Sequence, residues 1–254
     1  MKLNKKELIT KLLKGIETGD PESVKVVNEE KYIQHNPQTH EGSEGLAVLF
    51  KRLSKTSPRV NIVRVFQDAD FVFAHTEYDF ESRNIGLEIF RFEEEQAVEH
   101  WDNIQKRLGP NSSGHSMVDG ETQVSELEST ETNRAIIQSF VQDLLIDQKF
   151  ENINQYIKQG DYIEHSPHLK DDVVKLIIAL SNAGTVNTVI NYEKCHRVLA
   201  EGNFVLSVCE GKINSKPASL FDLYRLQDGK IVEHWDTREI IPSRDKWKNN
   251  NGKF

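Results

Sequence analysis

The chain has 254 residues and a formal net charge of −8 at pH 7, and 37% of its residues are hydrophobic and 28% charged. This length suits one large or two ordinary domains, and the composition can form a hydrophobic core, which excludes general disorder. A negatively charged surface repels a phosphate backbone, so we expect no nucleic-acid binding. No apolar run approaches the roughly 20 residues that span a bilayer, so we expect no membrane partner.

The N-terminus and the cysteines bear on the cellular compartment. The N-terminus is basic and then amphipathic, without the apolar core and small-residue cleavage site of a signal peptide. Cys195 and Cys209 show neither a zinc-site spacing nor a disulfide framework. We therefore expect a cytoplasmic protein with free buried thiols, although strands paired in a hairpin would bring the two cysteines close together.

The first part of the chain predicts helices followed by strands. Leu8, Leu12 and Ile16 have helical spacing, and Asp20-Pro21 predicts the start of a second helix, since proline is favoured at the first helical position. Residues 43–53 predict a third helix. From residue 71 onward the side chains alternate between two faces, which indicates strands.

The second part shows the same order of elements. Apolar residues have helical spacing over residues 136–145, and residues 171–184 predict a helix that ends at Gly184. The sequence LQDGKIVEHWD at residues 226–236 then predicts a strand, an Asp-Gly turn and another strand.

The order of elements returns because the sequence itself is repeated. VEHWD occurs at residues 98–102 and again at 232–236. Other matching pairs are YIQHNPQ at 32–38 with YIEHSPH at 162–168, RVFQDADFVFAHTE at 64–77 with RVLAEGNFVLSVCE at 197–210, LEIFRF at 87–92 with FDLYRL at 221–226, and NSSGHS at 111–116 with NNNGKF at 249–254. Five pairs in the same order, each offset by about 130 residues, indicate two diverged copies of a domain, because solenoid repeats run only about 20–50 residues.

We therefore predict an α+β fold with two tandem domains, residues 1–120 and 121–254. In each domain helices come first and antiparallel strands follow, so the helices are expected to cover one face of a curved sheet. The segment between the copies, Lys106–Glu131, is rich in Gly, Ser, Asn and Thr.

These motifs resemble a known family. The combination of Tyr-Ile-x-His-x-Pro with Val-Glu-His-Trp-Asp, closing on an Asn-rich Gly segment, is similar to the SnoaL-like polyketide cyclases of the nuclear transport factor 2-like superfamily. The resemblance covers nearly the whole chain, once per copy. It implies two cone-shaped (cystatin-like) domains, each with a pocket at one end, but one fold hosts many activities.

The two copies divide the family pattern between them. The first has Glu88 where such proteins often have Asp, and the second has Ser166 in place of Asn36 and Val208 in place of His75. Equal activity of the two sites is therefore in question.

The candidate catalytic residues lie on predicted strands. Glu88 and Asp222 occupy matching positions flanked by apolar residues, and a carboxylate that faces inward would have a raised pKa suited to a general base for enolisation. The alternative is an acid that faces solvent. His100 and Asp102 share one strand face, as do His234 and Asp236, opposite Trp101 and Trp235. These polar pairs either help to move protons in the pocket or flank a packed tryptophan.

Candidate substrate-binding residues come from the YIxH motifs and the alternating strand. His35 and His165 precede a residue held extended by proline, which favours a corner facing a pocket, and the alternative is a histidine bonded to backbone. The full set is Tyr32, His35, Asn36, His75, Tyr162 and His165.

No metal or cofactor is expected. His35, His75, His100 and Asp102 lack a tight ligand spacing, and the sequence has no G-x-S-x-G, G-x-G-x-x-G or P-loop motif. Three functions stay open: a cofactor-free lyase or isomerase of the polyketide-cyclase type acting on a small apolar carbonyl compound, a non-catalytic ligand-binding module, and a protein-interaction domain pair. The resemblance also implies that the two domains pair within the chain, with homo-oligomer formation left open.

Overall fold

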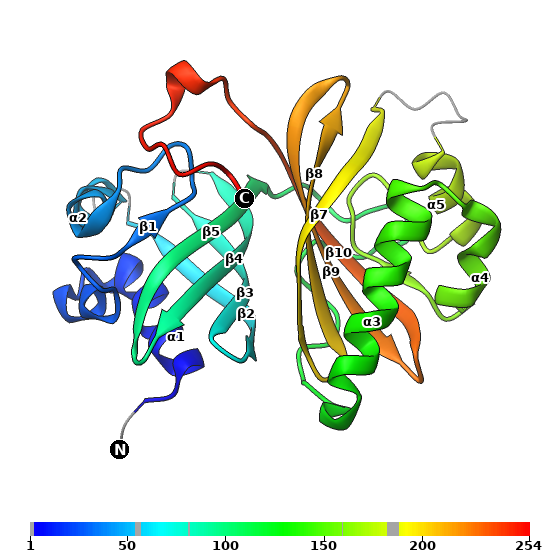
Figure 1. Ribbon diagram of the computed structural model, residues 1–254, viewed down its shortest axis with the longest axis horizontal. Coiled ribbons are helices and arrows are strands. Elements are labelled where there is room, and N and C mark those ends of the chain that lie inside the picture. Colours follow the sequence, from blue (N-terminus) through cyan, green and yellow to red (C-terminus); the bar gives the residue numbers. More distant parts are fainter. Residues whose placement is uncertain (1–2, 54–56, 81, 159, 182–187) are drawn as a thin grey trace. The chain divides into compact units, whose positions relative to one another are not determined.

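The computed structural model describes residues 3–53, 57–80, 82–158, 160–181 and 188–254. The chain forms two compact units: unit 1 comprises Met1–Lys106 and Ile241–Phe254, and unit 2 comprises Arg107–Ile240. Figure 1 shows that each unit contains helices packed on a sheet of its own. The predicted α+β class, with helices on a sheet in each half, is confirmed. None of the described helices is long and apolar enough to cross a membrane.

The two sheets have the same topology. The strand order is β1-β5-β4-β3-β2 in unit 1 and β6-β10-β9-β8-β7 in unit 2. The strands of unit 1 are β1 (Ile33–Gln34), β2 (Arg59–Asp68), β3 (Phe71–Asp79), β4 (Arg83–Glu93) and β5 (Gln96–Lys106). Those of unit 2 are β6 (Ile163–Glu164), β7 (Ile190–Glu201), β8 (Phe204–Ile213), β9 (Lys216–Gln227) and β10 (Lys230–Ile240).

Both sheets are mixed, which corrects the prediction of purely antiparallel sheets. The long strands form antiparallel hairpins, but β1 pairs in parallel with β5, and β6 with β10. The short strands join the sheet through crossover connections that include helices, and such a connection can place two strands in parallel. The predicted turn between β9 and β10 is confirmed: Asp228 and Gly229 have φ values of 51° and 70°, which this two-residue hairpin turn requires.

The helices of each unit precede its long strands. They are α1 (Lys5–Thr18) and α2 (Gly42–Leu53) in unit 1, and α3 (Thr130–Phe140), α4 (Ile153–Tyr156) and α5 (Val173–Leu180) in unit 2. Asp20-Pro21 starts a short 3-10 helix, Pro21–Val26, rather than an α-helix. The predicted helix end at Gly184 lies outside the described residues.

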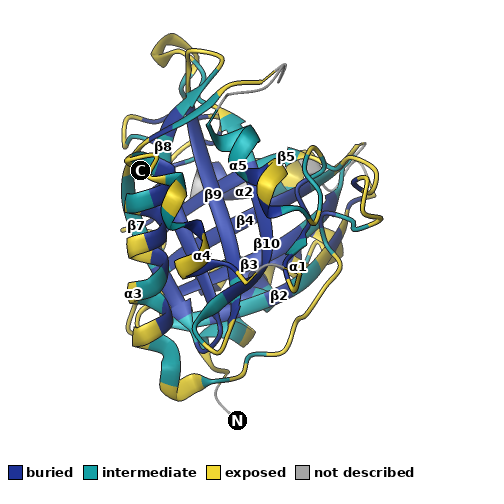
Figure 2. Ribbon diagram, turned by 90° about the vertical axis from the view of Figure 1, so that its right-hand side faces the viewer, coloured by how far each residue is buried: buried dark blue, intermediate teal, exposed yellow. Residues whose placement is uncertain are grey.

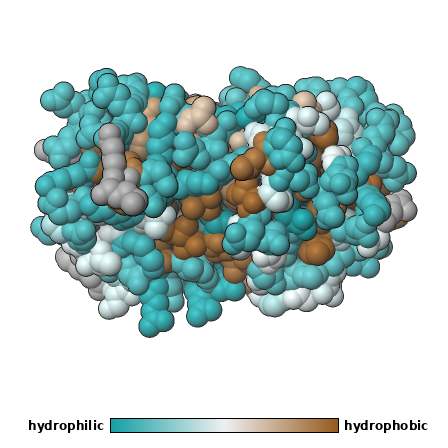
Figure 3. Space-filling model, turned by 90° about the horizontal axis from the view of Figure 1, so that it is seen from below, coloured by the Kyte–Doolittle hydropathy of each residue, from teal (hydrophilic) through white to brown (hydrophobic). Residues whose placement is uncertain are grey.

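Each unit has its own hydrophobic core between its helices and one face of its sheet. In unit 1 the core includes Ile9 and Leu12 of α1 with Phe90 of β4, and in unit 2 Phe140 of α3 with Tyr224 of β9. Figure 2 shows that the long strands are mostly buried, while helices and loops carry the exposed residues. On the face shown in Figure 3 hydrophilic residues predominate, and hydrophobic residues gather in patches.

The segments that follow β5 and β10 are exchanged between the units. The linking segment, residues 107–126, follows the last strand of unit 1 but belongs to unit 2, and the C-terminal segment, residues 241–254, follows the last strand of unit 2 but belongs to unit 1. Asn111 Nδ2 of the linking segment donates to Glu164 O at 2.6 Å. Asn249 Nδ2 of the C-terminal segment donates to Asn36 O at 2.7 Å.

The exchange explains why the compact units do not coincide with the sequence repeats. The predicted division at residue 120 concerns the repeats and stays a prediction, whereas each compact unit combines one repeat with the segment that follows the other. The two cysteines are directly paired across β7 and β8 and are free thiols.

Candidate functional site

The polar cluster of unit 2 is centred on His234 of β10. His234 Nδ1 lies 2.9 Å from Glu164 Oε1, and His234 Nε2 lies 3.1 Å from Asp222 Oδ1. The register explains the contacts, since Glu164 of β6 pairs directly with His234, and Asp222 of β9 lies diagonally across from it. All three side chains are buried. The imidazole is therefore held between two carboxylates.

These two carboxylates set the charge of His234. Burial alone lowers the pKa of a histidine, but the negative charges of Glu164 and Asp222 outweigh this effect and raise the pKa of His234 to about 10. Glu164 also accepts hydrogen bonds from Ser166 N at 2.8 Å and from Tyr162 Oη at 2.5 Å. At neutral pH His234 is thus a cation and a hydrogen-bond donor, and it is no base.

A tyrosine completes the environment of Asp222. Tyr192 Oη of β7 donates to Asp222 Oδ1 at 3.0 Å, with Oδ2 at 3.1 Å. Burial, together with the charge of Asp222, raises the pKa of Tyr192 well above 10, so its phenol stays protonated. Asp222 therefore faces one cationic and one neutral donor.

A second acid lies directly across the strands from the first. Asp236 pairs with Asp222 in the register of β9 and β10. Two carboxylates opposite each other repel, and Arg238 Nε at 2.5 Å from Asp236 Oδ2 offsets this repulsion. Ser166 Oγ donates to the same Asp236 oxygen at 3.3 Å.

A small cavity opens beside this cluster, under α3 and α5. The space that the centre of a water molecule can occupy in it is about 30 Å³. This is enough for about two waters. The cavity is lined by polar groups of Asp222, His234, Arg238, Tyr162 and Tyr192. The other lining residues are Phe140, Leu145, Ile157, Leu169, Leu176, Leu180, Tyr224 and Ile231. A carboxylate and a cation thus meet a mostly apolar space.

Unit 1 has a related cluster around His100 of β5. His100 Nε2 lies 2.7 Å from Glu88 Oε2, and His100 Nδ1 lies 3.1 Å from Gln34 Oε1. Gln34 occupies the place of Glu164, so among the described residues one carboxylate, that of Glu88, lies within hydrogen-bond distance of this imidazole. Gln34 Oε1 also accepts from Asn36 N at 2.8 Å, so it is an acceptor and His100 Nδ1 is the donor in this contact.

A tyrosine also binds the acid of unit 1, but it comes from a different strand. Tyr78 Oη of β3 donates to Glu88 Oε1 at 2.7 Å. Tyr78 pairs with Val60 across β2 and β3, and Tyr192 pairs with Gly211 across β7 and β8. The two cross-strand pairs correspond to each other, and each contains one tyrosine. In unit 1 the tyrosine lies on β3, the inner strand of the pair, and in unit 2 it lies on β7, the edge strand.

Asp102 takes its positive partner from the C-terminal segment. Asp102 lies directly across from Glu88, as Asp236 does from Asp222. Lys253 Nζ donates to Asp102 O at 2.8 Å and lies 3.4 Å from Asp102 Oδ1, and Asn36 Nδ2 donates to Asp102 Oδ2 at 2.6 Å. All of these side chains except Asn36 are almost completely buried.

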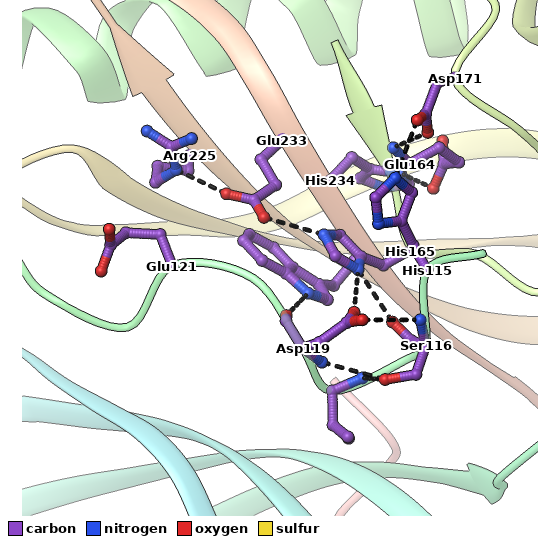
Figure 4. A network of polar contacts seen from close by, with 12 residues as sticks. His115, Ser116, Asp119, Glu121, Glu164, His165, Asp171, Arg225, Glu233 and His234 are labelled. Carbon is purple, nitrogen blue, oxygen red and sulfur yellow. Dashed lines mark hydrogen bonds and ion pairs between the residues drawn. The ribbon is translucent and has the colours of Figure 1, made fainter. Parts of the chain in front are cut away.

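The histidines of the YIxH motifs lie on the other face, beside the tryptophans. His35 stacks on Trp101 with ring centroids 4.6 Å apart, and His165 stacks on Trp235 at 4.7 Å. His35 Nε2 lies 3.0 Å from Glu99 Oε1, and burial lowers the pKa of His35 despite that contact. His165 does not line the described cavity. Figure 4 shows its contacts with the linking segment.

The remaining predicted ligand-binding residues are also buried. Tyr162 lines the cavity, and Tyr32 stacks against His100 with centroids 6.4 Å apart. His75 Nδ1 accepts from Arg64 Nη1 at 2.9 Å, since a guanidinium can only donate. Their role in ligand binding stays a prediction.

Sequence reasoning missed several members of the two clusters. Gln34 and Glu164 occupy the variable position of the YIxH motif, and a two-residue strand gives no periodic pattern to reveal which face they occupy. Tyr78 and Tyr192 do not align between the repeats. Arg238 lies two residues after Asp236 on the same strand, which is a signal that could have identified it.

Comparisons with known proteins give no family assignment from sequence. No family model matches the chain, and no curated protein matches it. Solved structures do match in fold. TsrD from Streptomyces laurentii is 19% identical, with 41% of this chain and 92% of that chain covered and a TM-score of 0.36.

Two further matches are of the same size. IdmH from Streptomyces antibioticus, a candidate polyketide cyclase, is 16% identical, with 41% and 93% of the two chains covered and a TM-score of 0.37. An NTF2-like protein of unknown function from Cytophaga hutchinsonii is 14% identical, with 41% and 93% covered and a TM-score of 0.36. Each match spans about the length of one repeat, and at these identities none carries a conclusion about a reaction.

Proposed function

We propose that unit 2 binds a small apolar carbonyl compound in the cavity beside Asp222 and catalyses a cofactor-free proton transfer, as a lyase or isomerase does. The observation that carries the proposal is the convergence of Asp222, Tyr192 and His234 on one mostly apolar cavity. A carboxylate at the wall of an apolar site is suited to remove a proton from a carbon next to a carbonyl.

The three polar groups take distinct roles in this reaction. Asp222 accepts the proton: the C–H bond breaks, an O–H bond forms on the carboxylate, and the electron pair moves to the carbonyl oxygen. Tyr192 then donates its hydrogen bond to that oxygen instead of to the neutralised Asp222. His234, held as a cation beside Glu164, lies 3.1 Å from Asp222 and orients that carboxyl group before the reaction. Return of the proton from Asp222 to another atom completes an isomerisation.

A ligand larger than water requires the cavity wall to move, because the described space is about 30 Å³. Leu176 and Leu180 of α5 form part of that wall. We infer that a displacement of α5 admits the ligand, so a Leu180→Ala variant should bind a given ketone more tightly than the wild type.

Hydrogen–deuterium exchange tests the proposal without a known substrate. The protein is incubated in D₂O with a panel of aromatic and steroid ketones, and loss of the α-hydrogen signal is followed by NMR. We expect Asp222→Asn to slow the catalysed exchange on the order of 10²–10⁴-fold, the usual contribution of a general base. Glu88→Gln is the matched control in unit 1, and it should leave the exchange rate unchanged. Equal rates in the wild type and Asp222→Asn would rule out this role.

Ligand binding without chemistry is the second candidate function, and the apolar lining of the cavity favours it. A thermal shift by one of these ketones that is lost in Leu176→Trp, together with no catalysed exchange, would select this function. We also propose that the two units pair through their sheets within one chain. Small-angle scattering that shows two separately tumbling lobes would contradict the pairing.

A further inference from the structure

A second group of titratable side chains lies outside the cavity, where the linking segment meets the residues after β6. One ligand atom from each of His115, Asp119 and His165 lies within 4.8 Å of the other two. His165 Nδ1 lies 2.7 Å from Asp119 Oδ1 and 2.8 Å from Ser116 O. None of these residues lines the described cavity or belongs to the Asp222 cluster. Figure 4 shows that they converge from two separate stretches of unit 2.

Each imidazole has one ring nitrogen within hydrogen-bond distance of a carboxylate outside the group. His165 Nε2 lies 2.9 Å from Glu233 Oε1, and His115 Nε2 lies 2.9 Å from Asp171 Oδ2. Glu233 is itself fixed by Arg225 Nε at 2.6 Å. Metal-binding histidines almost always donate their second N–H to such a partner, which orients the ring and strengthens the ligand. The second ring nitrogen of His165, Nδ1, faces Asp119 and Ser116 O, so a cation there would take the place of its proton.

Charge and access also fit a cation. Three carboxylates, Asp119, Asp171 and Glu233, surround the two imidazoles. The His165 side chain is only 1% exposed, but those of His115 and Asp119 are 31% and 48% exposed, so an ion can enter from solvent. Gly120 has φ +91°, and a Cβ there would clash with Glu233 and Trp235, so glycine permits the close approach of Asp119.

We propose that His115, Asp119 and His165 bind one Zn²⁺ or similar first-row divalent cation, which fastens the linking segment to unit 2. Two imidazoles and one carboxylate suit Zn²⁺, and the fourth position would be filled by water or by Ser116 O. The cation replaces the proton on His165 Nδ1, so its affinity rises with pH.

The corresponding place in unit 1 provides an internal comparison. His35 corresponds to His165, but Lys253 occupies the position of His115, one residue after the glycine of the Asn-rich segment. Its ammonium group lies against Asp102 and repels a cation. The proposal therefore specifies one ion per chain.

The test is titration of the chelator-treated full-length protein with Zn²⁺ by calorimetry and with Co²⁺ by visible absorption. We expect one ion per chain, and at least a 10-fold weaker Kd in each of His115→Ala and Asp119→Ala. These two residues are partly exposed, so the variants should fold. His196→Ala is the matched control, because His196 also contacts a carboxylate, Glu210, in unit 2, and its Kd should match the wild type.

Several outcomes would overturn the proposal. They are the absence of binding at millimolar Zn²⁺, a stoichiometry above one with equal affinities, and binding that both His115→Ala and Asp119→Ala leave intact. Proton exchange at Asp222 is independent of this site, so either proposal can fail without the other.

Discussion

His100 of unit 1 and His234 of unit 2 occupy the same register position, each next to a two-residue parallel strand, but they have different neighbours. His234 lies between two carboxylates, whereas His100 lies between one carboxylate and the amide of Gln34. The exchange of Glu164 for Gln34 thus removes one of the two carboxylates that hold the imidazole of unit 2 as a cation. Identical VEHWD motifs therefore do not imply identical chemistry.

The second difference concerns the positive partner of the paired acids. In unit 2 it is Arg238 on the same strand as Asp236, and in unit 1 it is Lys253 on the C-terminal segment. All the members of the unit 2 cluster lie between β6 and β10. The unit 1 cluster also needs Lys253, which lies near the C-terminus. The two sites should therefore respond differently to the same substitution.

Removal of the central histidine should show the largest difference. His234→Leu leaves two buried carboxylates without their shared cation, and we expect a loss of about 5 kcal/mol in the free energy of unfolding of unit 2. His100→Leu leaves one carboxyl group, that of Glu88, without its imidazole partner, so the loss in unit 1 should be smaller. Denaturation followed by amide exchange measures the loss of stability in each unit. Equal losses in the two variants would show that the two histidines are equivalent, contrary to this prediction.

The pH dependence of stability should follow His234. Its pKa is raised from 6.5 to about 10 in the folded state, so its contribution is fully present below pH 6.5 and is lost as the pH rises towards 10. The stability of unit 2 should therefore fall over this interval, on the order of 3–4 kcal/mol.

Glu164→Gln gives unit 2 the amide found in unit 1 and is the matched variant for this effect. It should lower the pKa of His234, which NMR titration of the imidazole measures, and reduce the pH slope. An unchanged slope in this variant would show that Glu164 is not the cause.

The tyrosines should give the smallest effect. Tyr78→Phe and Tyr192→Phe each remove one buried hydrogen bond to a carboxylate, and we expect each to cost about 1–3 kcal/mol in its own unit. Amide exchange resolves the unit affected. A loss in only one unit would show that the two tyrosines are not equivalent despite their matching cross-strand pairs.

The parts of this design that could be predicted are those with a regular pattern. Alternation along a strand placed His100 and Asp102 on one face and Trp101 on the other, because side chains on a strand have a period of two. The repeated anchors predicted two similar folds, because the same apolar spacing produces the same elements. Gln34 and Glu164 lie outside any periodic stretch, so their side of the sheet could not be inferred.

The exchange of the terminal segments was equally invisible in the sequence. Asn111 and Asn249 each bond to backbone carbonyls at the end of the short parallel strand of a unit or just after it, and they occur in similar motifs. The two segments therefore dock through a similar asparagine contact, one on each unit. This docking brings His115 and Asp119 of the linking segment to His165, and the three residues have no regular spacing along the chain.

Because of the exchange, a cut in the chain does not separate the two units cleanly. A break after Lys106 would leave residues 107–254 with all of unit 2 and, in addition, the 14 residues that unit 1 lacks. Such a fragment carries a free arm that fits its missing counterpart, so pieces produced separately should recombine without a covalent bond. The junction between Lys106 and Arg107 is in this way a point for splitting and reassembly.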